Sequence, residues 1–245
     1  MSLAHSPSIV TNGLVLCLDA GNTKSYPGSG TTWTDLSGNG NTGTLTNGPT
    51  YSSSNGGSIV FDGVDDYIEL GANSNIQSIG SYATIECWFK SSALGTSTYS
   101  LMVGWGQGSA YYSNFGIGNW GSFSNQESIY LGYNSFTVCY ATEGSTKYHD
   151  GNWHHAVATI GPNRHKIYVD GVEKILTFGD VADSYSVTNI FGFSPTTTLQ
   201  VGRRPYIGGT GYFPGSIPTV RIYNRALTAS EIQQNFNALR GRFGV

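Results

Sequence analysis

The sequence predicts an all-β protein, a sandwich of two antiparallel sheets with one short helix at the C-terminus. Three observations lead to this fold class. Short segments in which apolar and polar residues alternate recur along the 245 residues. Gly, Asn and Ser separate these segments, and the 34 glycines provide many tight turns. Only one segment, near the C-terminus, has a helical period. Short strands divided by regular turns are typical of a sandwich.

Alternation of apolar and polar residues defines the predicted strands. In residues 83–90 the odd-numbered positions are apolar and form the core face, whereas Trp88 is predicted to point outward. Asp170 and Gly171 predict a hairpin turn, because Asp-Gly favours the two-residue turn that joins antiparallel strands. In chain order the predicted strands are 13–19, 57–62, 66–70, 83–90, 99–104, 128–133, 136–141, 153–160, 165–169, 172–178, 198–202 and 216–223.

The predicted helix spans residues 229–239. Thr228 and Glu231 have the spacing of a capping box, in which each side chain accepts a hydrogen bond from the other residue's backbone. Gly241 is predicted to end the helix.

One side of this helix is apolar. Ile232, Phe236 and Leu239 form a single stripe. Because so short a helix is unstable alone in water, the stripe is predicted to lie on the sandwich. Nothing along the chain marks a linker or a repeat, so residues 1–245 are predicted to form one domain.

Composition excludes several classes of function. Charged residues are 11% of the chain, the net charge is −3, and Lys and Arg do not cluster, so nucleic acid is not an expected partner. No apolar run reaches the ~20 residues of a membrane span. Residues 1–13 lack the basic start and apolar centre of a signal peptide.

The three cysteines, Cys17, Cys87 and Cys139, lie in apolar segments. They are predicted to be buried thiols, which is typical of synthesis in a reducing cytoplasm.

The spacing of Asp, Ser and Asn in residues 35–45, "DLSGNGNTGTL", raises the question whether this loop binds a calcium ion. An EF-hand loop requires Glu at its twelfth position, where this chain has Thr46, so that interpretation fails. Two alternatives stay open: another oxygen-lined metal loop, or a turn whose Asn and Asp side chains bond to their own backbone.

His154 and His155 are adjacent on a strand, point to opposite faces and cannot share one ion. No metal ligand is assigned.

No catalytic residue is predicted. Glycosidases generally need two carboxyl groups across the scissile bond, and no Glu of this chain has an acidic residue two positions away. Asp62, Asp65 and Asp66, in "DGVDDY", are interpreted as a turn.

The strongest functional signal is a group of aromatic residues among glycines in 99–123, with a smaller group near Arg203. Tyr and Trp present large amphipathic faces that suit stacking on sugar rings. The alternative is that these rings pack beneath loops or against another subunit. The candidate carbohydrate-binding residues are Trp105, Tyr111, Tyr112, Trp120, Tyr206 and Tyr212.

Several blocks, in this order, resemble the laminin-G-like jelly rolls of the concanavalin A-like lectin/glucanase superfamily: "GLVLCLDAGN", "DLSGNGNTGTLTNG", "SIVFDGVDDYIEL", "ATIECWFK", "DGNWHHAVATI", "IYVDGV", "LQVGRR" and "VRIYNRALTASEI". The resemblance implies a two-sheet jelly roll and, in many relatives, a calcium ion and a carbohydrate site. Pro218 and Thr219 stand where relatives often have Asp-Glu, so one expected calcium ligand is missing.

The two ends of the chain, "HSPSIVTNGLVLCLDAGN" and "IQQNFNALRGRF", further resemble single-domain structural proteins of tailed bacteriophages. This implies a non-catalytic, lectin-like protein that is made in the host cytoplasm and displayed on the virion surface. Its partner would be a surface glycan or a neighbouring capsid or tail protein, and a homo-oligomer stays open. The alternative is a glycoside hydrolase or other polysaccharide-active enzyme, although the acidic E-x-D-x-x-E strand of the glucanase branch is absent.

Overall fold

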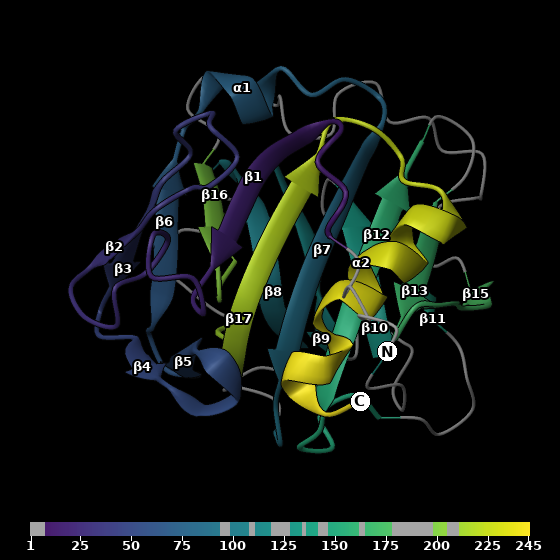
Figure 1. Ribbon diagram of the computed structural model, residues 1–245. Coiled ribbons are helices and arrows are strands. Elements are labelled where there is room, and N and C mark those ends of the chain that lie inside the picture. The colour runs from purple at the N-terminus through teal and green to yellow at the C-terminus, as the bar shows by residue number, and fades with distance from the viewer. Residues whose placement is uncertain are drawn as a thin grey trace, which may run out of the picture.

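The computed structural model describes residues 8–93, 99–107, 111–118, 128–133, 136–141, 147–161, 165–177, 198–204 and 211–245. Within these ranges the chain forms two antiparallel sheets packed face to face, with a helix on the outside of one of them (Figure 1). The predicted jelly-roll sandwich with a C-terminal helix is confirmed.

Sheet A has eight strands among the described residues. Its order is β14 (Val172–Glu173), β13 (Lys166–Val169), β12 (Trp153–Ile160), β7 (Ala83–Lys90), β17 (Pro214–Tyr223), β5 (Ser58–Asp62) and β4 (Thr50–Ser52), and β1 (Leu14–Asp19) also pairs with β17. The turn at Asp170 and Gly171 joins β13 to β14 as predicted, and both residues have the positive φ of a type I′ turn.

Sheet B has nine strands in the same described ranges. Its order is β15 (Leu176–Thr177), β11 (Phe136–Ala141), β10 (Ser128–Tyr133), β9 (Tyr111–Gly118), β8 (Tyr99–Gln107), β16 (Thr198–Val201), β6 (Tyr67–Gly71), β3 (Gly43–Thr46) and β2 (Thr32–Trp33). Two short helical turns, η1 (Ser54–Gly56) and α1 (Ser74–Gln77), lie between strands.

Several strand predictions need correction. The segment 172–178 was predicted as one strand, but β14 pairs in sheet A and β15 in sheet B, so the chain changes sheets after Glu173. The strands β2, β3, β4 and β9 were not among the predicted segments. In β9, glycines and aromatic residues mask the alternation that identifies a strand.

The core lies between the two sheets, and β7 supplies one of its central faces. Ile85, Cys87 and Phe89 are fully buried there, as the alternation predicts. Trp88 points away from this core, as predicted, but it is also fully buried. The reason is a third layer that the pattern of β7 alone does not reveal.

That third layer is α2 (Ala229–Phe243), which lies across the outer face of sheet A over β7 and β12 (Figure 1). Phe243 stacks on Trp88 with ring centroids 4.4 Å apart, and it packs at a tilt of 40° against Trp153 with centroids 4.8 Å apart. This contact explains why the predicted end at Gly241 was wrong. The helix continues to Phe243 and ends at Gly244, which adopts the left-handed conformation with φ 74°.

A buried polar network connects α2 to sheet A. Arg221 Nη1 donates to Glu86 Oε1 at 2.5 Å, and Asn235 Nδ2 of the helix donates to Glu86 Oε2 at 2.6 Å. The Nε2 atom of His155 lies 3.2 Å from Glu86 Oε1. Burial by itself raises the pKa of Glu86, but the charge of Arg221 and the contacts of His155 and Asn235 outweigh it and lower this pKa to about 2.

The described cysteines are buried thiols, as predicted. Cys17 is 5% exposed and Cys87 is fully buried, and both are free. Burial raises the pKa of each thiol, most strongly for Cys87. Cys139 lies in β11, and only its backbone is described.

Candidate functional site

The predicted carbohydrate-binding residues do not form one group. Trp105 is 1% exposed and belongs to the core between the sheets, so its ring has no face for a sugar and the prediction for it was wrong. Alternate positions of β8 and β9 face the core, which explains the burial. For Tyr111 and Tyr112 of β9 only the backbone is described, and Trp120 and Tyr206 lie outside the described residues. Tyr212 is 9% exposed and lies beside Arg203.

Tyr212 belongs to a cluster on the outer face of sheet B, which we call the Arg203 cluster. Its members are Tyr67, Glu69, Gln200, Arg203 and Tyr212. The guanidinium carbon of Arg203 lies 4.0 Å from the ring centre of Tyr67 and 5.9 Å from that of Tyr212. Arg203 therefore contacts the aromatic rings of two tyrosines.

Strand alternation places these side chains on one face. In β6, Ile68 and Leu70 enter the core, so Tyr67 and Glu69 point outward. In β16, the neighbours of Gln200 enter the core in the same way. Because β6 and β16 pair with Gln200 opposite Glu69, the two polar side chains meet.

A chain of hydrogen bonds holds Arg203 in place. The backbone amide of Gly71 donates to Glu69 Oε1 at 2.8 Å, and Gln200 Nε2 donates to Glu69 Oε2 at 2.5 Å. The Nε group of Arg203 then donates to Gln200 Oε1 at 2.9 Å. Gln200 is only 3% exposed and acts as the link, whereas Tyr67, Glu69 and Arg203 are partly exposed.

Strand β8 places glycines beside this cluster. Val103 and Trp105 face the core, so Gly104 and Gly106 occupy the outward positions. Gly104 pairs with Gln200 and Gly106 with Thr198. No β8 side chain rises next to the cluster, because glycine has none.

The candidate carbohydrate-binding residues predicted from the sequence included Tyr212, and the group near Arg203 was also noted. Tyr67 and Glu69 were missed. These residues come from a strand that is distant in the chain. The alternation of residues 66–70 shows that Tyr67 and Glu69 share a face, yet it does not show which strand lies next to them.

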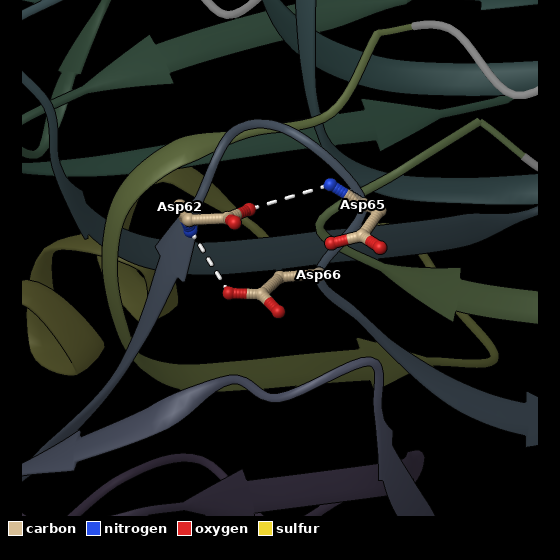
Figure 2. Close-up of side chains that lie close together, drawn as sticks. All are labelled: Asp62, Asp65 and Asp66. Atoms are coloured by element: carbon tan, nitrogen blue, oxygen red, sulfur yellow. Dashed lines mark hydrogen bonds between the residues drawn. The ribbon is translucent and has the colours of Figure 1, made fainter.

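A second group of polar side chains occupies the turn between β5 and β6. Figure 2 shows Asp62 accepting a hydrogen bond from the backbone of Asp65 and donating its own amide to Asp66. Each residue brings a carboxylate oxygen within 4.8 Å of the others, a spacing that oxygen ligands of a divalent cation can have. Asp62 and Asp65 are exposed and Asp66 is buried. The predicted turn is confirmed.

The carboxyl groups of this turn differ in pKa. Hydrogen bonds from the backbone, first that of Val64, lower the pKa of Asp62. Burial raises the pKa of Asp66, and the charges of Asp62 and Asp65 add to that effect. The main role of the Asp62 carboxylate is therefore to accept hydrogen bonds from the backbone amides of this turn.

The loop at residues 35–45 begins as a turn whose side chains bond to its own backbone and to the backbone of β1, and its last three residues belong to β3. Both carboxylate oxygens of Asp35 are engaged: Oδ1 accepts from the backbone of Cys17 and Ser37, and Oδ2 accepts from the Ser37 hydroxyl and the backbone of Asn41. Asn41 in turn donates to the carbonyl of Val15 at 2.8 Å. Four donors occupy the acceptor capacity of Asp35, which makes it a poor metal ligand. Of the two open alternatives, the structure supports the turn.

The two histidines lie on opposite faces of β12, as predicted. His155 is fully buried and stacks on Trp88 beneath α2. His154 lies between two carboxylates, with Nδ1 2.9 Å from Asp170 Oδ2 and Nε2 3.2 Å from Asp150 Oδ1. Burial opposes protonation of His154, but these carboxylates raise its pKa. Each histidine thus contacts a different set of neighbours.

In the part of the chain that the structure describes, no helix is long and apolar enough to span a membrane. No curated protein has a significant sequence match to the chain.

Solved structures share the fold at low sequence identity. Domain 4 of AbnA, a GH43 extracellular arabinanase from Geobacillus stearothermophilus solved with arabinotriose, has a TM-score of 0.65 and 19% identity over 91% of this chain and 97% of that one. A Trypanosoma rangeli sialidase solved with the inhibitor DANA has a TM-score of 0.63 and 17% identity over 95% of this chain and 35% of that one. The binding domain of Paraclostridial Mosquitocidal Protein 1 has a TM-score of 0.58 and 14% identity over 93% of this chain and 52% of that one.

These likenesses establish the fold alone. Membership of a family rests on the sequence itself, because residues 62–233, more than half of the chain, match the laminin G-like family model described as the concanavalin A-like lectin/glucanases superfamily. The chain therefore belongs to the concanavalin A-like lectin/glucanase superfamily.

Proposed function

We propose that the protein is a non-catalytic carbohydrate-binding protein that holds a glycan at the Arg203 cluster. The observation that carries this proposal is the placement of a partly exposed Arg203 against the rings of Tyr67 and Tyr212. Sugar rings stack on aromatic faces, and their hydroxyls bond to charged and amide groups. The cluster offers both kinds of contact in one place.

Two of the structural relatives support this proposal. The arabinanase domain was solved with a bound oligosaccharide, and the mosquitocidal protein contributes a binding domain. This chain has the same fold at low identity, so the support concerns the use of the fold for binding and not the sugar that is bound.

The non-catalytic part of the proposal rests on the Asp62 turn. A glycoside hydrolase generally uses two carboxyl groups whose pKa values differ. The opposite pKa shifts of Asp62 and Asp66 are the specific observation that favours this alternative. However, Asp62 Oδ1 accepts from the amides of its own turn, and Asp66 is buried. We therefore assign these carboxylates to the turn.

A glycan array followed by calorimetry tests the binding proposal. Saturable binding by the wild type should weaken by at least about tenfold in Tyr67→Ala, because a stacking face is lost. Tyr82→Ala is the matched control, since Tyr82 is 53% exposed and is not a member of the cluster. Absence of binding to every glycan, or equal affinity of Tyr67→Ala and wild type at unchanged melting temperature, would overturn the assignment.

Hydrolysis is tested on laminarin, agar, alginate and capsular polysaccharide by measuring released reducing ends. We expect none. Release that disappears in Asp66→Asn would establish the hydrolase alternative.

We also propose, from the resemblance of the chain ends to phage structural proteins, that the protein is displayed on a virion. It would bind either a surface glycan or a neighbouring capsid or tail protein. Mass spectrometry of purified particles tests this location. Recovery of the protein from particles without any glycan affinity would identify a structural component and not a lectin.

A further inference from the structure

We propose that the Arg203 cluster recognises an acidic saccharide, whose carboxylate is bound by the two Nη groups of Arg203. This inference rests on the proposed function and adds the chemical class of the glycan.

The hydrogen-bond donors of Arg203 point to this ligand. An arginine has five N–H donors, and the Nε–H of Arg203 is donated to Gln200. Among the residues that the structure describes, no acceptor is within hydrogen-bond distance of its Nη groups. The planar pair of Nη groups matches the two oxygens of a carboxylate, to which it can donate two parallel hydrogen bonds.

The guanidinium is held in position before any ligand arrives. Tyr67 packs on it at 4.0 Å, and the hydrogen-bonded chain through Gln200 and Glu69 anchors its Nε side. A side chain that is already ordered loses little conformational entropy on binding, so more of its interaction energy appears as affinity. The partly exposed ring of Tyr67 beside the guanidinium also places a stacking surface next to the carboxylate position.

The neighbouring charges favour a ligand of low charge density. Glu69 is part of the cluster, although Gly71 and Gln200 already donate to its two oxygens. Asp65 and Asp66 come directly before Tyr67 in the chain, and Asp65 is exposed. These carboxylates disfavour a polyanion such as a heavily sulfated glycan. A sugar with a single carboxylate matches the single guanidinium of the Arg203 cluster.

Binding measurements on matched pairs of oligosaccharides test the inference. The probes are sialyllactose and a trisaccharide with a single galacturonate residue, each beside the same compound with its carboxylate reduced to a primary alcohol, and one sulfated oligosaccharide. We expect at least one acidic probe to bind, its reduced form to bind at least about tenfold more weakly, and salt to weaken the acidic complex.

Variants of Arg203 identify the group responsible. Arg203→Gln should abolish the preference for the acidic probe, and Arg203→Lys should restore only part of it, because a lysine keeps the charge without the paired donors. Lys24→Gln is the matched control, as it removes one exposed positive charge elsewhere. Melting temperatures show whether each variant is folded, and retained binding of a neutral glycan by Arg203→Gln shows that the site itself is intact.

The outcomes separate the two proposals. Equal binding of acidic and reduced probes, binding of the sulfated probe alone, or an unchanged preference in Arg203→Gln would overturn the carboxylate inference while leaving carbohydrate binding in place. Failure of the wild type to bind any acidic or neutral glycan would overturn both.

Discussion

Phe236 of α2 lies parallel to Trp88 of β7, with ring centroids 5.6 Å apart and an interplanar angle of 6°. Sheet A thus has two buried faces: one against sheet B and one beneath the helix. The apolar stripe of Ile232, Phe236 and Leu239 that the sequence predicts is confirmed on this second face. The helix stabilises the fold because it covers the aromatic side chains of β7 and β12.

Phe236→Ala should lower the free energy of unfolding by about 3 to 5 kcal/mol, because Phe236 is only 7% exposed and its loss leaves a cavity against Trp88. Urea unfolding measures the change. Asn237→Ala is the control, since Asn237 lies on the exposed side of the same helix and should change stability little. An unchanged melting temperature in Phe236→Ala, combined with loss of incorporation into particles, would instead assign the helix to partner binding.

Thr228→Ala should cost roughly 1 kcal/mol through loss of the helix cap. The capping box is present: Glu231 N donates to Thr228 Oγ1 at 3.3 Å, and Thr228 N donates to Glu231 Oε2 at 2.9 Å. Chemical denaturation of the wild type, Thr228→Ala and Thr228→Ser measures this change in the free energy of unfolding. Thr228→Ser, which keeps the hydroxyl, should be close to wild type; equal destabilisation by Ser and Ala would rule out the capping hydrogen bond as the cause.

Acid should weaken the fold through Glu86. Its pKa is about 2 in the folded protein against an ordinary value of 4.5. As the pH falls below about 4.5, the unfolded state takes up the proton first. The contribution of Glu86 to stability is therefore complete above that pH and is lost as the pH falls toward 2.

Urea unfolding between pH 7 and 2 measures this loss, and carboxyl NMR measures the pKa of Glu86 directly. Glu86→Gln should be less stable at pH 7, because Arg221 loses its buried partner, and should lose less stability in acid. Glu231, whose pKa is also lowered to about 2 by Arg225, contributes in the same range. Glu231→Gln should remove only that second part. Parallel acid curves for Glu86→Gln and wild type would contradict the prediction.

EDTA should leave the melting temperature unchanged. The oxygens of Asp35 accept from its own turn and from the backbone of Cys17, and Asp62 accepts from the backbone of Val64 and Asp65. Thermal unfolding with EDTA and with added calcium provides the measurement. A rise of several degrees that requires calcium and disappears in Asp65→Asn would place an ion at the Asp62 turn, since binding to the native state raises stability by mass action.

The sequence by itself determined the elements whose signals are local. Alternation in residues 83–90 defines β7 and its core face, the pair Asp170 and Gly171 defines a hairpin turn, and Thr228 with Glu231 defines the start of α2. Each signal needs only residues a few positions apart, because the strand period, the turn and the cap are all properties of a short stretch of chain.

Only the tertiary structure decided which elements meet. The burial of Trp88 depends on α2, and the pairing of Glu69 with Gln200 joins residues 131 positions apart. Asn235 and Glu86 meet across 149 positions. A strand pattern shows which side chains share a face, but the neighbour of that face depends on how the sheets assemble. The buried charge beneath α2 and the Arg203 cluster are consequences of that assembly.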